Sequence, residues 1–284
     1  MLTRLLFTLC ILLGALCDSG YGVTIYAVDS QNRLVTFDSA TPGVLTSART
    51  IKLPPLVTYD SNRPLERIVS LAFRAADGPA TTRLWGLTNY GNIVPVNLAA
   101  ADIGLPVIKN ISLNGTAFGF GFDPTSAVNM LLVSNLDQNL RIKFNTGEVF
   151  TQTPLNYFMG TPTDPNVVAF AYDNNLSGVT QRTPYMIDSA ADTLVFLLPP
   201  FSDGILRTVG PLGVNASEIA GLTIYTTGTV GSPVNTAFAA ITSPGDSVSK
   251  LYTIDLSTGA ATLVGTIGKY EQGTYITAIA VISG

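Results

Sequence analysis

Short runs of β-branched and aromatic residues recur along most of the chain, and clusters of Gly, Pro, Asn and Asp separate them. Apolar positions spaced as on one face of a helix are nearly absent. Short runs of this composition between turn-forming clusters are typical of β-strands. The pattern therefore predicts an all-β fold.

One strand motif is repeated. Residues 33–38 (RLVTFD) and 250–255 (KLYTID) match position by position, and Ser, Thr and Gly follow each of them in a turn. Residues 92–97, 140–145 and 193–198 fit the same frame. The five copies end at residues 38, 97, 145, 198 and 255, so they lie 48 to 59 residues apart. Blades of four-stranded β-propellers repeat every 40 to 50 residues or so, apart from long loops. We therefore predict a β-propeller with five four-stranded blades.

A second strand type supports the same number of blades, because it also occurs five times and interleaves small residues with large apolar ones. Its copies are residues 71–74, 120–123, 169–173, 221–225 and 278–281. The innermost strands of a propeller crowd around the axis, so small residues fit there. The expected axial residues are Ala72, Gly121, Ala171, Gly221 and either Ala278 or Ala280.

The two ends of the repeat are incomplete. The last strand, 276–282, is followed by no partner strands, and the first copy, which starts at Val23, is preceded by no inner strand. We expect the N- and C-terminal strands to pair and close one blade, which would remove the open edge of the sheet. An open β-sandwich or a solenoid is the alternative. Pro95 lacks an N–H group and is expected to weaken the register of its blade, and residues 155–167 are expected to form a surface loop.

The N-terminus has the features of an export signal. A single positive charge at Arg4 precedes an apolar run over residues 5–16. This run is shorter than the 20 or so residues that span a bilayer, so it predicts a signal peptide over residues 1–22 and no stable membrane span. The rest of the chain, 23–284, is predicted to be a single propeller domain that is secreted from the cell.

Both cysteines, Cys10 and Cys17, lie in the predicted signal peptide. Disulfide bonds and thiol chemistry are therefore not expected in the mature chain. Lipidation of Cys17 is an alternative that the sequence disfavours, because Leu16 stands where a lipoprotein signal has a small residue.

Charged residues make up 12% of the chain and the net charge is -4, whereas soluble proteins average about 25% charged residues. The sequence has no basic run that could neutralise a phosphate backbone, so nucleic acid is not an expected partner. A weakly charged surface repels its own copies little, which favours self-association.

Several kinds of chemistry are excluded. The chain contains no histidine, which removes Ser-His-Asp triads, Cys-His pairs and histidine metal ligands. The glycines at 115–121 belong to a strand, so no phosphate-binding loop is present and no cofactor is expected. Paired carboxylates remain available, because a glycosidase needs only two acids about 5 to 10 Å apart.

Asp123 and Asp173 end equivalent strands of adjacent predicted blades, and Arg74 takes the corresponding place in another blade. These three residues are the ligand-binding candidates, at one mouth of the central channel. The alternative is that they cap turns. A carbohydrate site would also present aromatic side chains, for which the candidates are Trp85, Tyr90 and Tyr157; the alternative for each is packing in the core or at the rim.

Two further features of the sequence concern ions and modification. The turn over residues 135–139 offers Asn and Asp oxygens of the kind that bind Ca²⁺, but its spacing differs from an EF-hand loop, and an Asx turn is the alternative. Four N-glycosylation motifs are present, at Asn110, Asn114, Asn175 and Asn215.

Several of these segments together resemble a known family. They are residues 25–43, 120–124, 134–141 and 251–265. The likeness runs from about Thr24 to the C-terminus. The family consists of secreted, mostly bacterial proteins that are classified only as a domain of unknown function. The resemblance implies export and a propeller-like repeat but no activity or site. This chain lacks the C-terminal sorting helix of some members, so release from the cell is expected.

Two functions are consistent with these features. The first is an exported, non-catalytic structural or interaction protein that forms filaments or a surface layer, in which the N-terminal strand of one copy completes the sheet of the next. The second is a carbohydrate-binding module or a carboxylate-based carbohydrate-active enzyme. The expected partners are accordingly a second copy of the chain or an extracellular glycan.

Overall fold

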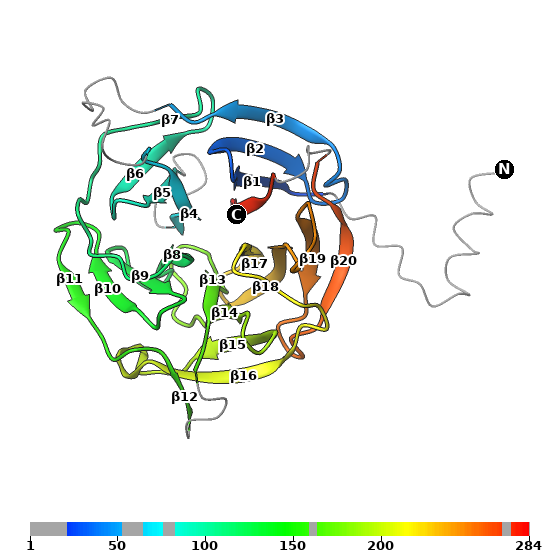
Figure 1. Cartoon of the computed structure of the whole chain (residues 1–284). Helices are drawn as coiled ribbons and strands as arrows, with labels where there is room; N and C mark the ends of the chain where they lie inside the picture. Colours follow the sequence, from blue (N-terminus) through cyan, green and yellow to red (C-terminus); the bar gives the residue numbers. More distant parts are fainter. Residues whose placement is uncertain (1–21, 53–64, 76–82, 159–163, 269–273, 284) are drawn as a thin grey trace.

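The structure is a computed structural model that describes residues 22–52, 65–75, 83–158, 164–268 and 274–283. The predicted signal peptide, residues 1–22, lies outside these ranges except for Gly22. The described strands form five sheets that surround a common axis (Figure 1). The prediction of an all-β propeller with five blades is therefore confirmed.

Each blade has four strands, counted from the axis outwards, and one blade carries a fifth, described below. The innermost strands are β4 (Ile68–Phe73), β8 (Phe118–Phe122), β13 (Val167–Tyr172), β17 (Ala220–Thr229) and β21 (Ile276–Val281). The second strands are β1 (Thr24–Asp29), β5 (Leu84–Thr88), β9 (Asn129–Ser134), β14 (Pro184–Asp188) and β18 (Ser232–Ile241). The third strands are β2 (Arg33–Asp38), β6 (Ile93–Asn97), β10 (Asn139–Lys143), β15 (Thr193–Leu197) and β19 (Lys250–Ile254). The outer strands are β3 (Leu45–Thr50), β7 (Asp102–Ile103), β11 (Val149–Thr151), β16 (Ile205–Pro211) and β20 (Ala261–Thr266).

The two strand types found in the sequence occupy fixed places in the blades. The five copies of the first motif are the third strands, and the five copies of the second are the innermost strands. We number the blades from blade 1, which is β21-β1-β2-β3, through blades 2, 3 and 4, which begin at β4, β8 and β13, to blade 5, which begins at β17. The innermost strands contact one another in this order and close the ring between β21 and β4.

Blade 1 contains both ends of the described chain. Strand β21 pairs antiparallel with β1, with Ile25 opposite Val281 and Ala27 opposite Ile279. The predicted pairing of the N- and C-terminal strands is therefore confirmed. Because β21 belongs to the last part of the chain, the ring is closed by backbone hydrogen bonds between segments about 250 residues apart.

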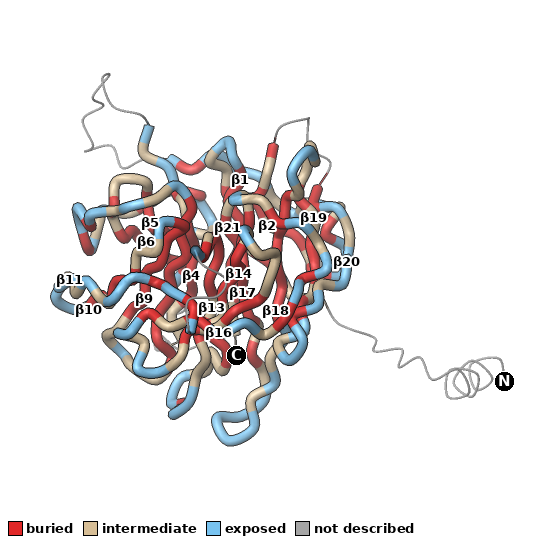
Figure 2. The backbone as a smooth tube through the Cα atoms, turned by 60° about the horizontal axis from the view of Figure 1, so that its bottom comes forward, coloured by how far each residue is buried: buried red, intermediate tan, exposed pale blue. Residues whose placement is uncertain are grey.

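The hydrophobic core is divided among the blade interfaces. Five clusters of buried side chains each lie between two neighbouring blades. Phe37 between blades 5 and 1, Leu84 between blades 1 and 2 and Met186 between blades 3 and 4 are fully buried. Burial is concentrated on the strands near the axis, whereas the outer strands and the loops are exposed (Figure 2).

Pro95 does not disturb its blade. The pairing of β5 with β6 continues through Trp85 opposite Pro95 without a shift. The N–H of Gly104 donates to the carbonyl oxygen of Pro95 at 2.9 Å, so the polar groups of this residue face the outer strand β7. The missing N–H falls on the outer side of the sheet, where β7 has only two residues. The expectation of a weakened register is therefore wrong.

The predicted surface loop over residues 155–167 is corrected at its start, and its residues 159–163 lie outside the described ranges. Its start forms strand β12 (Asn156–Tyr157), which runs parallel to β16 and adds a fifth strand to the outside of blade 4. Leu155 and Tyr157 are only 2% and 4% exposed. The partner strand lies about 50 residues further along the chain, which a local sequence pattern does not reveal.

Candidate functional site

The space along the propeller axis is divided into two separate pockets. A pocket of about 270 Å³ lies where the innermost strands begin, and a second of about 40 Å³ lies where they end. Between them only about 10 Å³ is open, lined by side chains such as Phe118, Phe170 and Leu222. A ligand that enters at the first end therefore reaches a closed floor.

The larger cavity, called here the polar pocket, receives residues from all five blades. Its lining includes Asp29 and Thr277 of blade 1, Arg67 and Ile68 of blade 2, Thr116 and Phe118 of blade 3, Val168 of blade 4 and Glu218 of blade 5. Apolar walls with a few polar groups at fixed places are typical of small-molecule sites.

Glu218 is held by neutral donors. One carboxylate oxygen accepts a hydrogen bond from the Thr116 hydroxyl at 3.0 Å. The other accepts from the side-chain amides of Asn135 at 3.0 Å and Asn166 at 3.4 Å. In the described part of the chain this carboxylate has no cationic partner. It is therefore a fixed, charged acceptor at the edge of the pocket.

Arg67 comes just before the innermost strand of blade 2 and is exposed. Its backbone N–H donates to the side chain of Asn89 at 2.8 Å, and its carbonyl accepts from the backbone of Asn89 at 3.0 Å. The guanidinium group forms no hydrogen bond or ion pair with the described residues. Its donors are therefore available to a ligand.

The other acid at the pocket is neutralised. Asp29 is 2% exposed, and its side chain contacts the guanidinium Nε of Arg33 at 2.7 Å. It also accepts hydrogen bonds from the backbone N–H groups of Gln31 and Arg33. These contacts fix the turn between β1 and β2 and leave Glu218 as the acid with a free charge among the residues that line the pocket.

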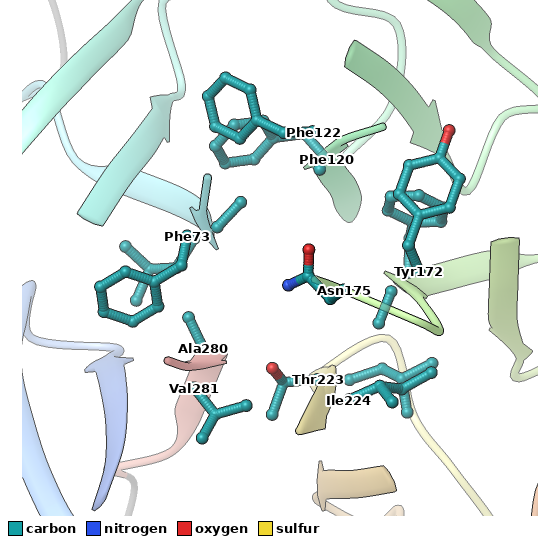
Figure 3. Close-up of a pocket in the computed structure, with 15 residues that line it drawn as sticks. Phe73, Phe120, Phe122, Tyr172, Asn175, Thr223, Ile224, Ala280 and Val281 are labelled. Atoms are coloured by element: carbon teal, nitrogen blue, oxygen red, sulfur yellow. The ribbon is translucent and has the colours of Figure 1, made fainter. Parts of the chain in front are cut away.

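The small pocket at the opposite end is lined by residues from all five blades (Figure 3). The rings of Phe73, Phe122 and Tyr172 point away from the axis and pack between the blades, while the amide of Asn175 extends toward the axis. A space of about 40 Å³ holds little more than a water molecule. This end is therefore less suited to a ligand than the polar pocket.

Asp123, a ligand-binding candidate from the sequence, lies beyond the end of β8 and is bound within the fold. One oxygen of its carboxylate accepts from the backbone and the hydroxyl of Thr125, at 2.9 and 2.6 Å. The other forms an ion pair with Arg182 at 2.7 Å, which links blade 3 to blade 4. Asp123 does not line the polar or the small pocket in the described structure.

Asp173 and Arg74 are held in the same way. Asp173 accepts from the backbone N–H of Thr183 at 2.5 Å, and burial raises the pKa of its carboxyl above the usual 3.8. The guanidinium of Arg74 donates to the carbonyl of Ala127 and lies 4.7 Å from the ring centre of Phe144. The three candidates thus lie at one end of the propeller, and each has a structural contact there.

The aromatic candidates are mostly internal. Trp85 and Tyr157 are 5% and 4% exposed, and Tyr90 is half-buried. Trp85 packs edge-on against Phe144, and the Tyr157 hydroxyl donates to Asp188. Exposed aromatic rings at a channel mouth are therefore not found at Trp85 and Tyr157, which pack in the core instead.

The turn over residues 135–139 is organised by its own hydrogen bonds. The side-chain oxygen of Asn135 accepts from the backbone N–H groups of Thr116 and Ala117, at 2.9 and 3.1 Å. These two bonds tie the turn to the segment before β8, while the Ser134 hydroxyl accepts from the backbone N–H groups of Leu136 and Gln138 within the turn. Among the described residues, no group of three or more acids, cysteines or histidines is arranged to hold a metal ion.

Asp137 in this turn is predicted to make stability depend on pH. Burial raises the pKa of Asp137 to about 6, and the charges of Asp164 and Asp188 and a hydrogen bond with Asp164 act in the same direction. The folded state therefore holds its proton more tightly than the unfolded chain, so stability falls as the pH rises from about 4 through 6. We expect Asp137→Asn to stabilise the protein by about 1 kcal/mol at pH 8, discounted for partial exposure, and to change little at pH 4.

Urea unfolding of both proteins at the two pH values measures this difference. Asparagine also suits the left-handed backbone at this position, where φ is 59°. The exposed Asp203→Asn is the matched control and should behave alike at both pH values. An equal gain at pH 4 and pH 8 would contradict the role assigned to the charge.

The four glycosylation motifs differ in accessibility. Asn110, Asn114 and Asn215 are exposed in loops, whereas Asn175 is half-buried beside the small pocket. The backbone N–H of Asn175 donates to the Thr226 hydroxyl at 2.9 Å. A glycan on Asn175 would therefore occupy the end of the axis opposite the polar pocket.

The sequence reasoning missed the residues of the polar pocket. Arg67, Thr116 and Glu218 each stand just before an innermost strand, in loops that share no motif. Charged residues make up only 12% of the chain, so a charged side chain directly before an innermost strand is unusual. This feature of the sequence could have indicated Arg67 and Glu218. The prediction relied on the ends of these strands, because Asp123 and Asp173 occur there as a pair.

Within the described ranges, no helix is long and apolar enough to cross a membrane. No curated protein matches the sequence. The similar solved structures include hydrazine synthase of Kuenenia stuttgartiensis, at 10% identity and a TM-score of 0.41 over 74% of this chain and 53% of that chain. This chain thus spans about half of that one. They also include YCF48 bound to D1 peptide, at 10% identity and a TM-score of 0.41 over 86% and 68% of the two chains.

The WD40 domain of Pan2 from Neurospora crassa is a third, at 12% identity and a TM-score of 0.36 over 88% and 68% of the two chains. A family match is more extensive. Residues 33–280 match the domain of unknown function DUF4394, from the third strand of blade 1 to the last strand of the ring. The chain therefore belongs to the DUF4394 family.

Proposed function

We propose that this protein is a secreted, non-catalytic binding protein that holds a carbohydrate in the polar pocket. The observation that supports this most directly is the pair of available polar groups at the pocket, the guanidinium of Arg67 and the carboxylate of Glu218, above an apolar floor. Sugars present hydroxyl groups around an apolar ring face, and pockets that bind them combine both kinds of contact. The export signal expected from the sequence supports a function outside the cell.

The arrangement of acids supports binding rather than hydrolysis. A glycosidase needs two carboxyl groups, one on each side of the scissile bond. Among the acids that line the polar pocket, Asp29 is committed to Arg33 and to its own turn, which leaves Glu218. The pocket volume of about 270 Å³ is close to the lower end of the range for ligand sites, about 300 to 1,000 Å³, and suits one or two sugar units.

A glycan array probed with the mature protein tests the proposal. We expect binding to at least one saccharide, with an affinity that falls about tenfold or more in Glu218→Gln, because the amide removes the negative charge and replaces one of the two accepting oxygens with an N–H₂ donor. The matched control is Glu148→Gln on blade 3, whose carboxylate is paired with Lys143 away from the pocket. Thermal melting checks that both variants are folded.

Two results would count against this site. Absence of saccharide binding by the parent protein removes the proposal. Binding that survives in Glu218→Gln but is lost in the double variant Asp123→Asn, Asp173→Asn would move the site to the opposite end of the propeller, where the sequence placed it.

Self-assembly outside the cell is a second candidate, favoured by an exposed apolar patch. Leu263 and Val264 are 57% and 37% exposed on β20, the outer strand of blade 5, and Val44, just before the outer strand β3 of blade 1, is 64% exposed. Gly268 N–H donates to the Pro42 carbonyl at 2.8 Å and joins the two edges. Unpaired outer strands with apolar side chains promote association. Electron microscopy at several concentrations should show ordered filaments or layers, and dispersed monomers throughout would oppose this candidate.

A further inference from the structure

Arg67 is the basic residue among those that line the polar pocket, and no acidic side chain of the described residues pairs with it. Arg33 and Arg182, by contrast, are each bound to a buried carboxylate at 2.7 Å. Arg67 has no such partner among the described residues, and the nearby Glu66 is bonded instead to Thr88 and Asn92. An arginine that is not neutralised within the fold offers its planar set of N–H donors to a carboxylate.

Arg67 and Glu218 come from blades that are not neighbours. The innermost strand of blade 2 contacts those of blades 1 and 3, whereas Glu218 precedes the innermost strand of blade 5 and is bonded over blades 3 and 4. The two opposite charges form no ion pair with each other. The polar pocket therefore offers donors on one side and a charged acceptor on another.

We infer that the ligand of the polar pocket is an acidic sugar, a saccharide unit with a carboxylate that pairs with Arg67 and hydroxyl groups that donate to Glu218. This inference rests on the proposed function and names its ligand class. The fork of a guanidinium matches the two oxygens of a carboxylate, which gives both strength and orientation. The apolar side chains of Ile68, Phe118 and Val168 lie against the ring face of the sugar.

Apart from Glu218, the charges at the pocket do not oppose an anionic ligand. The carboxylate of Asp29 is paired with Arg33, so it does not repel an incoming anion strongly. A neutral sugar would satisfy Glu218 and Thr116 but leave the Arg67 donors to water. An acid without hydroxyl groups would pair with Arg67 and leave Glu218 without a new donor. A sugar acid supplies both partners.

The test compares acidic sugars with neutral forms of the same sugars. Oligosaccharides of glucuronic, galacturonic and mannuronic acid, each paired with its methyl ester, are titrated into the mature protein by calorimetry. We expect at least one acid to bind about tenfold more tightly than its ester, and its affinity to fall between about 50 and 300 mM salt. Arg67→Gln should bind acid and ester alike. Arg207→Gln, at an exposed position on β16, should retain the preference.

The outcomes separate this inference from the proposed function. Equal binding of acids and esters by the parent, or a preference that persists in Arg67→Gln, overturns the inference and leaves the proposed function in place. If only neutral or sulfated saccharides bind on the array, the pocket does not recognise a carboxylate and the inference is overturned. No saccharide binding of any kind overturns both.

Discussion

Replacing Gly119 with alanine should lower the free energy of unfolding by about 3 kcal/mol, near the upper end for an overpacked core. Gly119 lies on β8 of blade 3, where β13 of blade 4 passes closely. A Cβ atom at this position would lie 2.4 Å from the Cβ and 2.9 Å from the backbone nitrogen of Phe170. Contacts below 3 Å with backbone atoms require a strand to shift, and that shift would increase the distance between the two blades.

Two other glycines complete the series. A Cβ at Gly121 would meet the Phe170 ring at 2.8 Å, so Gly121→Ala should cost less, because a ring can move more easily than a strand. Gly231 is the control: nothing lies within 4 Å of its Cβ position, so Gly231→Ala should change stability by less than about 0.5 kcal/mol. Guanidinium unfolding followed by fluorescence of Trp85, the single tryptophan, measures all three. Equal stabilities of Gly119→Ala and Gly231→Ala would show that this close approach does not set the blade spacing.

The repeat was readable from the sequence because each strand position imposes its own composition. In every blade the third strand buries two successive positions and, after one less buried position, a third, as in β2 and β19. The innermost strands need small residues, which marked Ala72, Gly121 and Gly221 as axial. Both requirements act locally on a strand, so they leave a periodic signal along the chain. Closure of the ring followed from counting incomplete copies at the two ends.

The candidate site was less predictable, because it depends on side chains that meet from different blades. Asp123 and Asp173 share a position at strand ends, but only the structure reveals that Arg182, 59 residues after Asp123, pairs with the first of them. Whether an end of the axis is open depends on how the rings of Phe73 and Tyr172 pack between blades and on the placement of Asn175. These are non-local packing effects that single-sequence patterns do not encode.

The proposed ligand-binding residues at the start of the innermost strands stand next to a rim that is fixed by hydrogen bonds. The hairpins between second and third strands reach the same end, where Asp29, Thr88, Ser134 and Asp188 each accept backbone hydrogen bonds within their own turns. These bonds fix the rim as a ring of rigid turns. Glu218 is tied to that ring through Asn135. A charged group held by such a rim needs little reordering when a ligand binds.

A chain that ends at residue 273 should lose cooperative folding altogether, since it lacks β21. This strand buries Ile276, Ile279 and Val281, which are 0%, 2% and 3% exposed. Each such side chain stabilises the fold by about 1.5 to 3 kcal/mol, and domains as a whole are stable by only about 5 to 15 kcal/mol. Loss of the strand also leaves one edge of β1 without its hydrogen-bond partner. Circular dichroism and unfolding curves should show no cooperative transition.

A peptide of residues 274–284 should restore that transition when added to the shortened chain, in proportion to its concentration, whereas the same peptide with Ile276→Asp and Ile279→Asp should not. A shortened chain as stable as the full one would contradict the closure of blade 1 by β21.

The reconstitution also bears on self-assembly. If the edge of β1 accepts a separate peptide, it can accept β21 from a second copy, and the pairing that closes one ring would then join two chains head to tail. The effective concentration of the covalently linked β21 favours closure within one chain. Head-to-tail joining of two chains therefore requires a high protein concentration or the dissociation of β21 from β1.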